Sequence, residues 1–327
     1  MRSLFICLVL AGVAGAQVYV DSFSYPDGTL VPGWTEKRGD WIVAAGRVHT
    51  QTASTWSYLT KDGYVLKDCV TEADVIYEGA GAVVQFGGTD CRHLGGPNDS
   101  NIVMCKIQNN GGVADFDRFF TYERVVGAVT FTDIIPGTLA ARVRFKVAGT
   151  NCITQVDSDL NGTWDLTHTK TLTTNLLAGE LGVNAFHFSP LTRSSAVDNF
   201  ALFDAVLNTV GTPNVGATLG LSLQGQNPGS TYQVACSLSN APGIPVDTRN
   251  IPLTPDAFML LSFSLPTVFV QFTGTLDANA SARALIVIPP IPMLAGFSFY
   301  AGFVTVNPAS PSGIENISND ERITIVP

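Results

Sequence analysis

Short runs of apolar and β-branched residues, separated by turn residues, make up most of the chain. Gly, Asp, Asn and Pro bound these runs, and apart from the first residues no segment of helical length repeats with a 3.6-residue period. Many short strands between such turns are typical of β-sandwiches. The pattern predicts an all-β protein with strands near residues 41–43, 70–77, 82–86, 102–107, 141–147, 153–156, 200–203, 218–223, 232–238, 284–288, 297–306 and 323–326.

The composition changes near residues 210–213, where a Gly-Thr-Pro turn follows a strand-like run. Residues 17–210 hold all four Trp, all four His and all six Lys, whereas residues 211–327 hold none of these and carry nine charged side chains. We therefore expect two domains, residues 17–210 and a smaller antiparallel β-sandwich over residues 211–327.

The chain as a whole is poor in charge and acidic. Charged residues make up 14% of it, against roughly 25% in an ordinary soluble domain. The net charge of −9 and the pI near 4.8 argue against a nucleic-acid partner, because neutralising phosphates requires a basic surface.

The first residues, MRSLFICLVLAGVAGAQ, are typical of a secretory signal peptide over residues 1–16. Arg2 supplies the positive start, residues 4–13 are apolar, and Ala14-Gly15-Ala16 is a small-residue cleavage site. A buried N-terminal strand or helix is the alternative interpretation. Because later apolar runs are broken by Gly, Pro or charge, no transmembrane segment is expected, and we predict a protein that is secreted or held at the cell surface.

An exported chain meets oxidising conditions, in which cysteines pair. Cys69, Cys91, Cys105 and Cys152 allow three connectivities, of which we favour Cys91–Cys105 with Cys69–Cys152. Cys236 is left over as a buried thiol.

The clearest metal motif is Asp157-Ser158-Asp159-Leu160-Asn161-Gly162-Thr163-Trp164-Asp165. Oxygen donors at positions 1, 3, 5 and 9, with Gly at position 6, match part of a calcium loop. His168 stands where an EF-hand has its bidentate Glu, and no helices flank the motif, so it is not an EF-hand. Two interpretations stay open: a hairpin turn alone, or a turn that binds Ca²⁺ through Asp157, Asp159, Asn161 and Asp165.

Aromatic side chains are the candidates for sugar binding, since sugar rings pack their C–H faces on exposed aromatic rings. Trp56 and Tyr58 lie in a polar segment and alternate to one face of a predicted strand, so we take them as the ligand-binding pair.

The apolar stretch 258–272, with four Phe, has two interpretations. It forms two core strands around a turn at Pro266, or it presents an apolar face to a protein or cell-envelope partner.

The order of several motifs in the first domain resembles a known superfamily. These motifs are Asp21-Ser22-Phe23, Pro26-Asp27-Gly28-Thr29-Leu30, Pro32-Gly33-Trp34, Gly39-Asp40-Trp41-Ile42-Val43, Gly46-Arg47-Val48, Gly179-Glu180-Leu181-Gly182-Val183 and Val197-Asp198-Asn199-Phe200. Residues 18–206 resemble the concanavalin A-like lectin/glucanase superfamily in its laminin-G-like jelly-roll branch. The resemblance implies a jelly-roll β-sandwich for residues 17–210, with Trp34 and Trp41 in the core.

In the glucanase branch, one strand carries the catalytic carboxylates as E-x-D-x-E or E-x-D-x-x-E. Here Glu72, Asp74 and Glu78 share one face of a predicted strand, with the spacing E-x-D-x-x-x-E. The resemblance would make Glu72 the nucleophile, Asp74 the helper and Glu78 the acid only if a bulge realigned them. The non-catalytic branch also has acidic residues here, before a Gly-rich turn like Gly79-Ala80-Gly81.

The resemblance also implies a calcium ligand at Asp198 in the last strand, with Asp21 as its neighbour in the first. A polar residue satisfied by backbone donors is the alternative for Asp198.

Residues 211–327 resemble a C-terminal module of large secreted proteins from planctomycete bacteria. The residues that suggest it include Gly211-Thr212-Pro213, Pro289-Pro290-Ile291-Pro292 and Leu294-Ala295-Gly296. This resemblance implies no activity.

These observations favour a secreted, non-catalytic protein that binds a glycan or cell-surface polysaccharide and that Ca²⁺ stabilises. The first alternative is a glycoside hydrolase using Glu72, Asp74 and Glu78. The second is a structural envelope or matrix protein.

Overall fold

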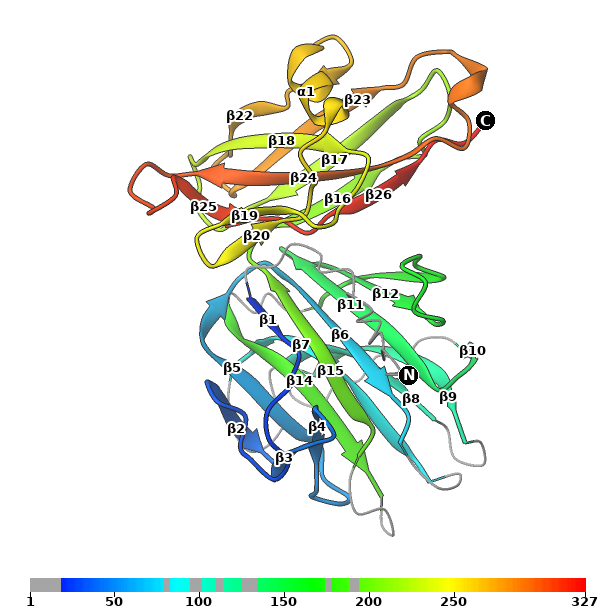
Figure 1. The fold of residues 1–327 in the computed structure, drawn as a ribbon, viewed down its shortest axis with the longest axis vertical. Helices are drawn as coiled ribbons and strands as arrows, with labels where there is room; N and C mark the ends of the chain where they lie inside the picture. The colour runs from blue at the N-terminus through cyan, green and yellow to red at the C-terminus, as the bar shows by residue number, and fades with distance from the viewer. Residues whose placement is uncertain are drawn as a thin grey trace, which may run out of the picture.

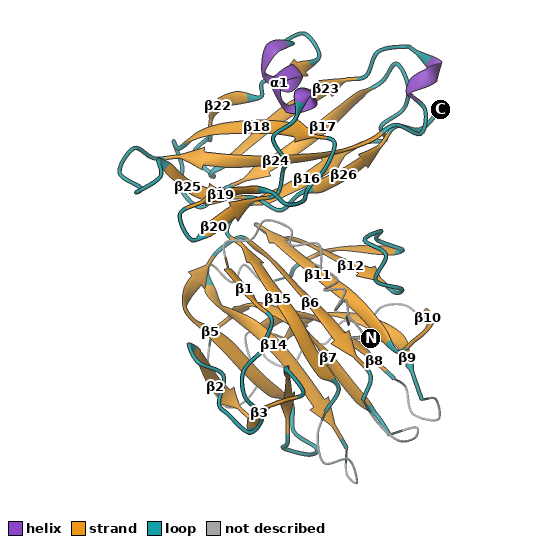
Figure 2. Ribbon diagram, in the orientation of Figure 1, coloured by secondary structure: helices purple, strands orange, loops and turns teal. Residues whose placement is uncertain are grey.

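The computed structural model describes residues 19–78, 83–94, 102–109, 114–124, 134–173, 178–188 and 194–327. Within these ranges nearly all regular structure is β-strand, which confirms the predicted all-β class, and the strands form two sandwiches (Figures 1 and 2). The predicted signal peptide, residues 1–16, and the turn at residues 79–81 lie outside the described residues.

The first sandwich packs two antiparallel sheets face to face, with eight and seven described strands. The larger sheet has the spatial order β13 (Leu166–Thr171), β12 (Asn151–Asp157), β11 (Ala140–Ala148), β6 (Cys69–Ile76), β15 (Ala196–Phe203), β4 (Arg47–Thr50) and β3 (Trp41–Ala44), with β1 (Tyr19–Asp21) also paired to β15. The smaller sheet has the order β10 (Ile134–Thr138), β9 (Phe116–Arg124), β8 (Ile102–Gln108), β7 (Gln85–His93), β14 (Gly179–His187), β5 (Ser57–Leu66) and β2 (Trp34–Arg38).

Strand β11 shows why these residues form a sandwich wall. Its sequence alternates between apolar and basic residues, and successive side chains of a strand point to opposite faces. Val143, Phe145 and Val147 are fully buried in the core between the sheets. Arg144 and Lys146 therefore point out of the larger sheet. Trp34 and Trp41 lie in the same core, as expected.

The second sandwich has its own apolar core, which includes Leu221, Val234 and Phe303. One sheet has the order β16 (Val206–Val210), β17 (Thr218–Gln224), β23 (Ser281–Val287) and β21 (Phe269–Val270). The other has the order β22 (Thr273–Thr275), β18 (Thr231–Ser237), β24 (Ser298–Val306) and β25 (Ile314–Ile317), with β26 (Glu321–Thr324) also paired to β24; β19 (Ile244–Val246) and β20 (Arg249–Ile251) form a hairpin. Strand β15 belongs to the first sandwich and ends at Phe203, whereas β16 begins at Val206 and pairs with β17 in the second. The chain therefore passes from one sandwich to the other between residues 203 and 206, a few residues before the predicted boundary.

The segment 258–272 is not two core strands, and the expectation that no helix follows the signal peptide is wrong. Residues Ala257–Ser264 form helix α1, and only the short strand β21 follows it. Asp256 caps the helix, its side chain accepting a hydrogen bond of 2.8 Å from the backbone N–H of Met259. The helix escapes detection because its residues are apolar or Ser on every side, so they show no 3.6-residue period. A short 3-10 turn, η1 (Pro292–Leu294), precedes β24.

The predicted cysteine pairs are wrong, because the strand register holds the two members of each pair apart. Cys69 and Cys152 each lie opposite Val147, on either side of β11, so their strands are about 10 Å apart. Cys105 lies opposite Thr89 and is thus a diagonal neighbour of Cys91, roughly 7–8 Å away. Both separations exceed the usual reach of a disulfide. Cys91 instead lies beside Cys69.

The second sandwich sits on one end of the first (Figure 1). Two basic side chains of β11 reach across to it. Arg144 forms an ion pair with Asp320 at 3.1 Å, and Lys146 forms one with Glu321. All four residues are buried, with at most 8% of their surface exposed. Gln226 of the second sandwich adds a hydrogen bond to the backbone oxygen of Asp68.

Candidate functional site

Strand alternation in the seven-stranded sheet brings aromatic side chains together on the face that points away from the core. We call this set the aromatic face. Trp56 is the hub, with its ring centroid 4.9 Å from that of Phe86 and 5.2 Å from that of Tyr122. The members of the aromatic face are Trp56, Tyr58, Phe86, Phe120, Tyr122 and Phe186.

Lys106 of β8 projects into this face. Its ammonium lies 3.6 Å from the ring centroid of Phe86 and 4.5 Å from that of Trp56, distances at which cation–π attraction operates. The same nitrogen donates a hydrogen bond of 2.7 Å to Gln108 Oε1. Burial lowers the pKa of Lys106 well below its ordinary value, because an ammonium loses hydration there.

Asp90 of β7 is the second ionisable group of this face. Its side chain is fully buried, and burial raises its pKa to about 8. Among the described residues, none donates a hydrogen bond of good geometry to either carboxyl oxygen, while the nearby amide of Asn184 favours the ionised form. Gly88, two residues earlier, is required by close packing, since a Cβ atom there would lie 2.1 Å from the backbone oxygen of Cys105.

The predicted pair Trp56 and Tyr58 does share this face, as strand alternation implied. Their exposure differs, because Tyr58 is 1% exposed while Trp56 is only partly buried. Trp56 is thus the member that can still offer ring surface to a ligand, and Tyr58 lies in the packing beside it. Sequence reasoning missed Phe86, Asp90 and Lys106, although alternation along residues 86–90 and 102–108 places them on one face.

The acidic loop between β12 and β13 gathers the residues predicted to bind calcium. Oxygen atoms of Asp157, Asp159 and Asp165 lie within 4.8 Å of one another. Asp157 accepts backbone hydrogen bonds from Asn161 and Gly162, and the Asn161 amide donates to Asp159 at 2.8 Å. The loop therefore brings together all four predicted residues.

The chemistry of this donor set fits a hard cation such as Ca²⁺, which takes carboxylate and carbonyl oxygens. Asp157 is 1% exposed, and burial together with Asp159 raises its pKa. Hydrogen bonds from the Ser158 hydroxyl and backbone lower the pKa of the exposed Asp165. Three converging carboxylates repel one another, and a divalent cation would remove that repulsion.

The carboxylates of β6 and the residues after it are held in ion pairs. Asp74 accepts two hydrogen bonds from the Arg142 guanidinium, at 2.7 and 3.0 Å. Glu72 pairs with Arg144, which also holds Asp320 of the second sandwich.

Glu78, two residues beyond the end of β6, completes the predicted catalytic set. It forms an ion pair with Arg47 at 2.9 Å and lies 3.8 Å from His49. Each of the three carboxylates thus already has a cationic partner.

Asp198 and Asp21, the other calcium candidates, lie apart from the acidic loop. Four donors surround the Asp21 carboxylate: the Trp34 indole at 2.8 Å, the Tyr19 and Tyr25 hydroxyls, and the Phe23 backbone. Asp198 accepts a hydrogen bond from the Asn199 backbone and lies 3.8 Å from the Arg47 guanidinium. Over the described ranges, neither residue belongs to a cluster of three or more potential metal ligands.

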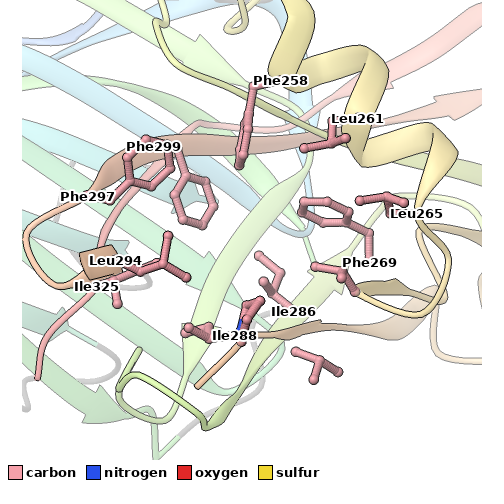
Figure 3. Close-up of a pocket in the computed structure, with 13 residues that line it drawn as sticks. Phe258, Leu261, Leu265, Phe269, Ile286, Ile288, Leu294, Phe297, Phe299 and Ile325 are labelled. Carbon is pink, nitrogen blue, oxygen red and sulfur yellow. The ribbon is translucent and has the colours of Figure 1, made fainter. Parts of the chain in front are cut away.

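An apolar cavity of about 200 Å³ opens in the second sandwich between α1 and the sheets (Figure 3). Phe258, Phe269 and Phe299 line it together with Ile286, Leu294 and other apolar residues (Figure 3). Leu260 and Met293, which precede the lining residues Leu261 and Leu294 in the chain, are 67% and 90% exposed.

No known protein family and no curated protein matches the chain. Among solved structures, several are similar to about half of the chain. The carbohydrate-binding module CBM66 from Bacillus subtilis is 16% identical, with 52% of this chain and 94% of that one covered and a TM-score of 0.38.

The CBM2 module of the evolved Dit protein of Lactobacillus casei BL23 phage J-1 is 13% identical over 57% of this chain and 95% of that one, with a TM-score of 0.41. Lectin II from Ulex europaeus is 12% identical over 57% and 98%, with a TM-score of 0.38.

The part of the chain that the structure describes contains no helix long and apolar enough to span a membrane.

Proposed function

We propose that the protein is exported and binds a glycan or cell-surface polysaccharide through the aromatic face of its first sandwich. The observation that carries this proposal is Trp56, a partly exposed indole held edge-on by Phe86 and Tyr122. A ring fixed in this way loses little conformational freedom when a sugar stacks on it, which favours binding. The Lys106 nitrogen lies 4.5 Å from the indole centroid, a position from which its protonated form polarises the ring.

Glycan-array screening followed by calorimetry with the best glycan tests this proposal. We expect Trp56→Ala to weaken binding by roughly 3- to 10-fold, the size of one aromatic contact. Trp164→Ala is the matched control, since Trp164 is also half-buried but stacks on Arg144 outside the aromatic face. A wild-type chain that binds no glycan, or equal losses in the two variants, would contradict the proposal.

Calcium bound by Asp157, Asp159, Asn161 and Asp165 is the stabilising part of the proposal. A ligand that binds only the folded state raises its stability. We expect millimolar Ca²⁺ to raise the melting temperature by about 5 °C over that in chelator.

The calcium effect should disappear in Asp159→Asn. Asp277→Asn is the matched control, because the Asp277 side chain also accepts backbone hydrogen bonds, from Asn279 and Ser281, but belongs to no carboxylate cluster among the described residues. Equal melting temperatures of the wild type in Ca²⁺ and in chelator would refute calcium binding.

Hydrolysis by Glu72, Asp74 and Glu78 is the alternative, and their ion pairs argue against it. A retaining glycosidase needs an ionised nucleophile beside a protonated acid. Here a basic side chain already pairs with each of the three carboxylates, so their oxygens are engaged within the protein and not with a sugar. We expect no reducing sugar to be released from β-glucans. Release that Glu78→Gln abolishes would establish the alternative. A purely structural role in an envelope or matrix would show as an absence of glycan binding.

A second candidate function belongs to the second sandwich, where we propose that the apolar cavity takes the acyl chain of a cell-envelope lipid. Its lining offers no polar partner, which excludes sugars and peptide backbones. Its volume exceeds that of a 150 Å³ cavity that binds benzene. Leu260 and Met293 expose further apolar surface beside lining residues in the chain, and a contact made by apolar side chains would not depend on anionic headgroups.

Flotation with neutral phosphatidylcholine vesicles tests this second function. We expect the chain to float with the vesicles at low and high salt alike, and Leu260→Ser combined with Met293→Ser to reduce the bound fraction several-fold. Val65→Ser is the control, because Val65 of the first sandwich is similarly exposed at 64%. No flotation of the wild type, or loss only at high salt, would overturn the proposal.

A further inference from the structure

Two cysteines from opposite sheets meet in the core of the first sandwich. Cys69 begins β6 in the larger sheet, and Cys91 lies near the end of β7 in the smaller one. Both side chains point inward and are fully buried, and their Sγ atoms are 2.6 Å apart. Two sulfur atoms this close are within reach of a covalent bond without movement of either strand.

Among the described residues, the other two inward thiols, Cys105 and Cys152, do not have a second sulfur atom placed in this way. Cys105 is engaged by the Thr89 hydroxyl at 3.4 Å, while the Thr71 hydroxyl donates to Thr89 at 3.0 Å and lies 3.7 Å from Cys91. These threonines thus stand between the Cys69–Cys91 pair and Cys105. Cys152 lies two strands from Cys69 across β11. The packing therefore selects one pair out of the four cysteines of this domain.

We propose that Cys69 and Cys91 form a disulfide that ties the two sheets of the first sandwich together. In this step the two thiols lose two protons and two electrons, and one S–S bond forms between their Sγ atoms. The electrons pass to the disulfide of a thiol oxidant, such as a protein dithiol–disulfide exchanger, whose S–S bond breaks to give two thiols. Cys105 and Cys152 remain thiols.

The environment indicates when this bond forms. Burial and the neighbouring Cys69 raise the pKa of Cys91, so in the closed core this thiol is a weak nucleophile. No oxidant reaches a fully buried sulfur. The bond therefore forms while the sheets are still coming together, and afterwards the same burial protects it from reductants.

Peptide mapping of the full chain, secreted by a bacterial host and alkylated without reduction, tests the proposal. Trypsin cuts after Lys67, Arg92, Lys106, Lys146 and Lys170, so Cys69 and Cys91 fall on one peptide, residues 68–92. Cys105 and Cys152 fall on two others, residues 93–106 and 147–170. We expect peptide 68–92 two hydrogens lighter than its dithiol and unalkylated, with the other two peptides alkylated.

Every other pattern overturns the proposal. Alkylation of both cysteines in peptide 68–92 would show free thiols, and a cross-link from it to peptide 93–106 would show the Cys91–Cys105 pair.

Thermal melting supplies a second readout. We expect unfolding in a reductant to lower the melting temperature of the wild type by roughly 5–10 °C, since a loop of this length constrains the unfolded chain. Cys69→Ala combined with Cys91→Ala should melt at the reduced temperature and not respond to the reductant. Cys105→Ala combined with Cys152→Ala, the matched control, should still respond. A wild type indifferent to reductant would contradict the proposal.

Discussion

At the scale of single residues, Asp90 is a carboxyl group whose burial opposes its ionisation. The seven-stranded sheet holds this carboxyl on the aromatic face, near the carboxyl of Glu180. Burial raises its pKa to about 8, so the folded protein binds a proton that the unfolded chain has lost above about pH 4. The folded state then holds more protons than the unfolded state between these values, and its stability falls as pH rises through that window.

Asp90→Asn should remove this dependence. The amide keeps the shape of the protonated carboxyl without its ionisation, so we expect the stability advantage of the variant over the wild type to grow by about 4 kcal/mol between pH 5 and pH 8, about 1.4 kcal/mol for each pH unit. Urea unfolding across this pH range measures the difference. Parallel stability curves for the two proteins would show that Asp90 does not titrate in this window.

At the scale of an element, α1 depends on its cap more than on its own sequence. The Asp256 side chain accepts hydrogen bonds from the backbone of Met259 and of Leu238 and from the Ser237 hydroxyl. Burial alone would raise the pKa of Asp256, but these donors lower it below its ordinary value. The cap therefore joins the helix to β18. It holds α1 in place as one wall of the apolar cavity (Figure 3).

Removing this cap should loosen the helix. We expect Asp256→Ala to destabilise the second sandwich by about 1–2 kcal/mol at pH 7, the usual cost of losing an N-cap. Because the pKa is lowered in the folded state, this contribution is present above the unfolded pKa and fades as pH falls below it, so the two proteins should converge in acid. Chemical unfolding at both pH values measures this, and a constant difference would exclude the titrating cap.

At the scale of the whole molecule, the ion pairs of β11 join the two sandwiches. Arg144 is shared between Glu72 of its own sheet and Asp320 of the other domain, and Lys146 pairs with Glu321. These charges are buried, so removing one partner leaves an uncompensated charge, which costs about 3–5 kcal/mol. The carboxylate strand that resembled a catalytic one thus contributes to the junction between domains.

Asp320→Asn combined with Glu321→Gln should separate the domains thermally. We expect one calorimetric transition in the wild type and two in the variant, with the first sandwich melting earlier because Arg144 loses one of its two partners and Lys146 loses Glu321. Asp247→Asn is the control, since Asp247 pairs with Arg249 inside the second sandwich. A single transition in the double variant would show that apolar contacts alone couple the domains.

The features that the sequence determined are the local ones. Alternation predicts most strands, including β11, because a strand shows its buried face in its own residues. The acidic loop came together as expected because Asp157 to Asp165 lie within a single hairpin. The Asp, Asn and Gly residues of these nine positions favour the turn through local backbone contacts.

Only the tertiary structure decided the partners that come from elsewhere in the chain. Packing of sheet on sheet placed Cys91 beside Cys69, and packing of domain on domain gave Glu72 and Arg144 their neighbour Asp320. Alternation says which face of a strand a side chain points to, but not which strand lies opposite. That choice follows from how apolar faces many residues apart in the chain bury one another. The hydrophobic effect that drives this burial is non-directional, so the residues of one strand do not specify its partner.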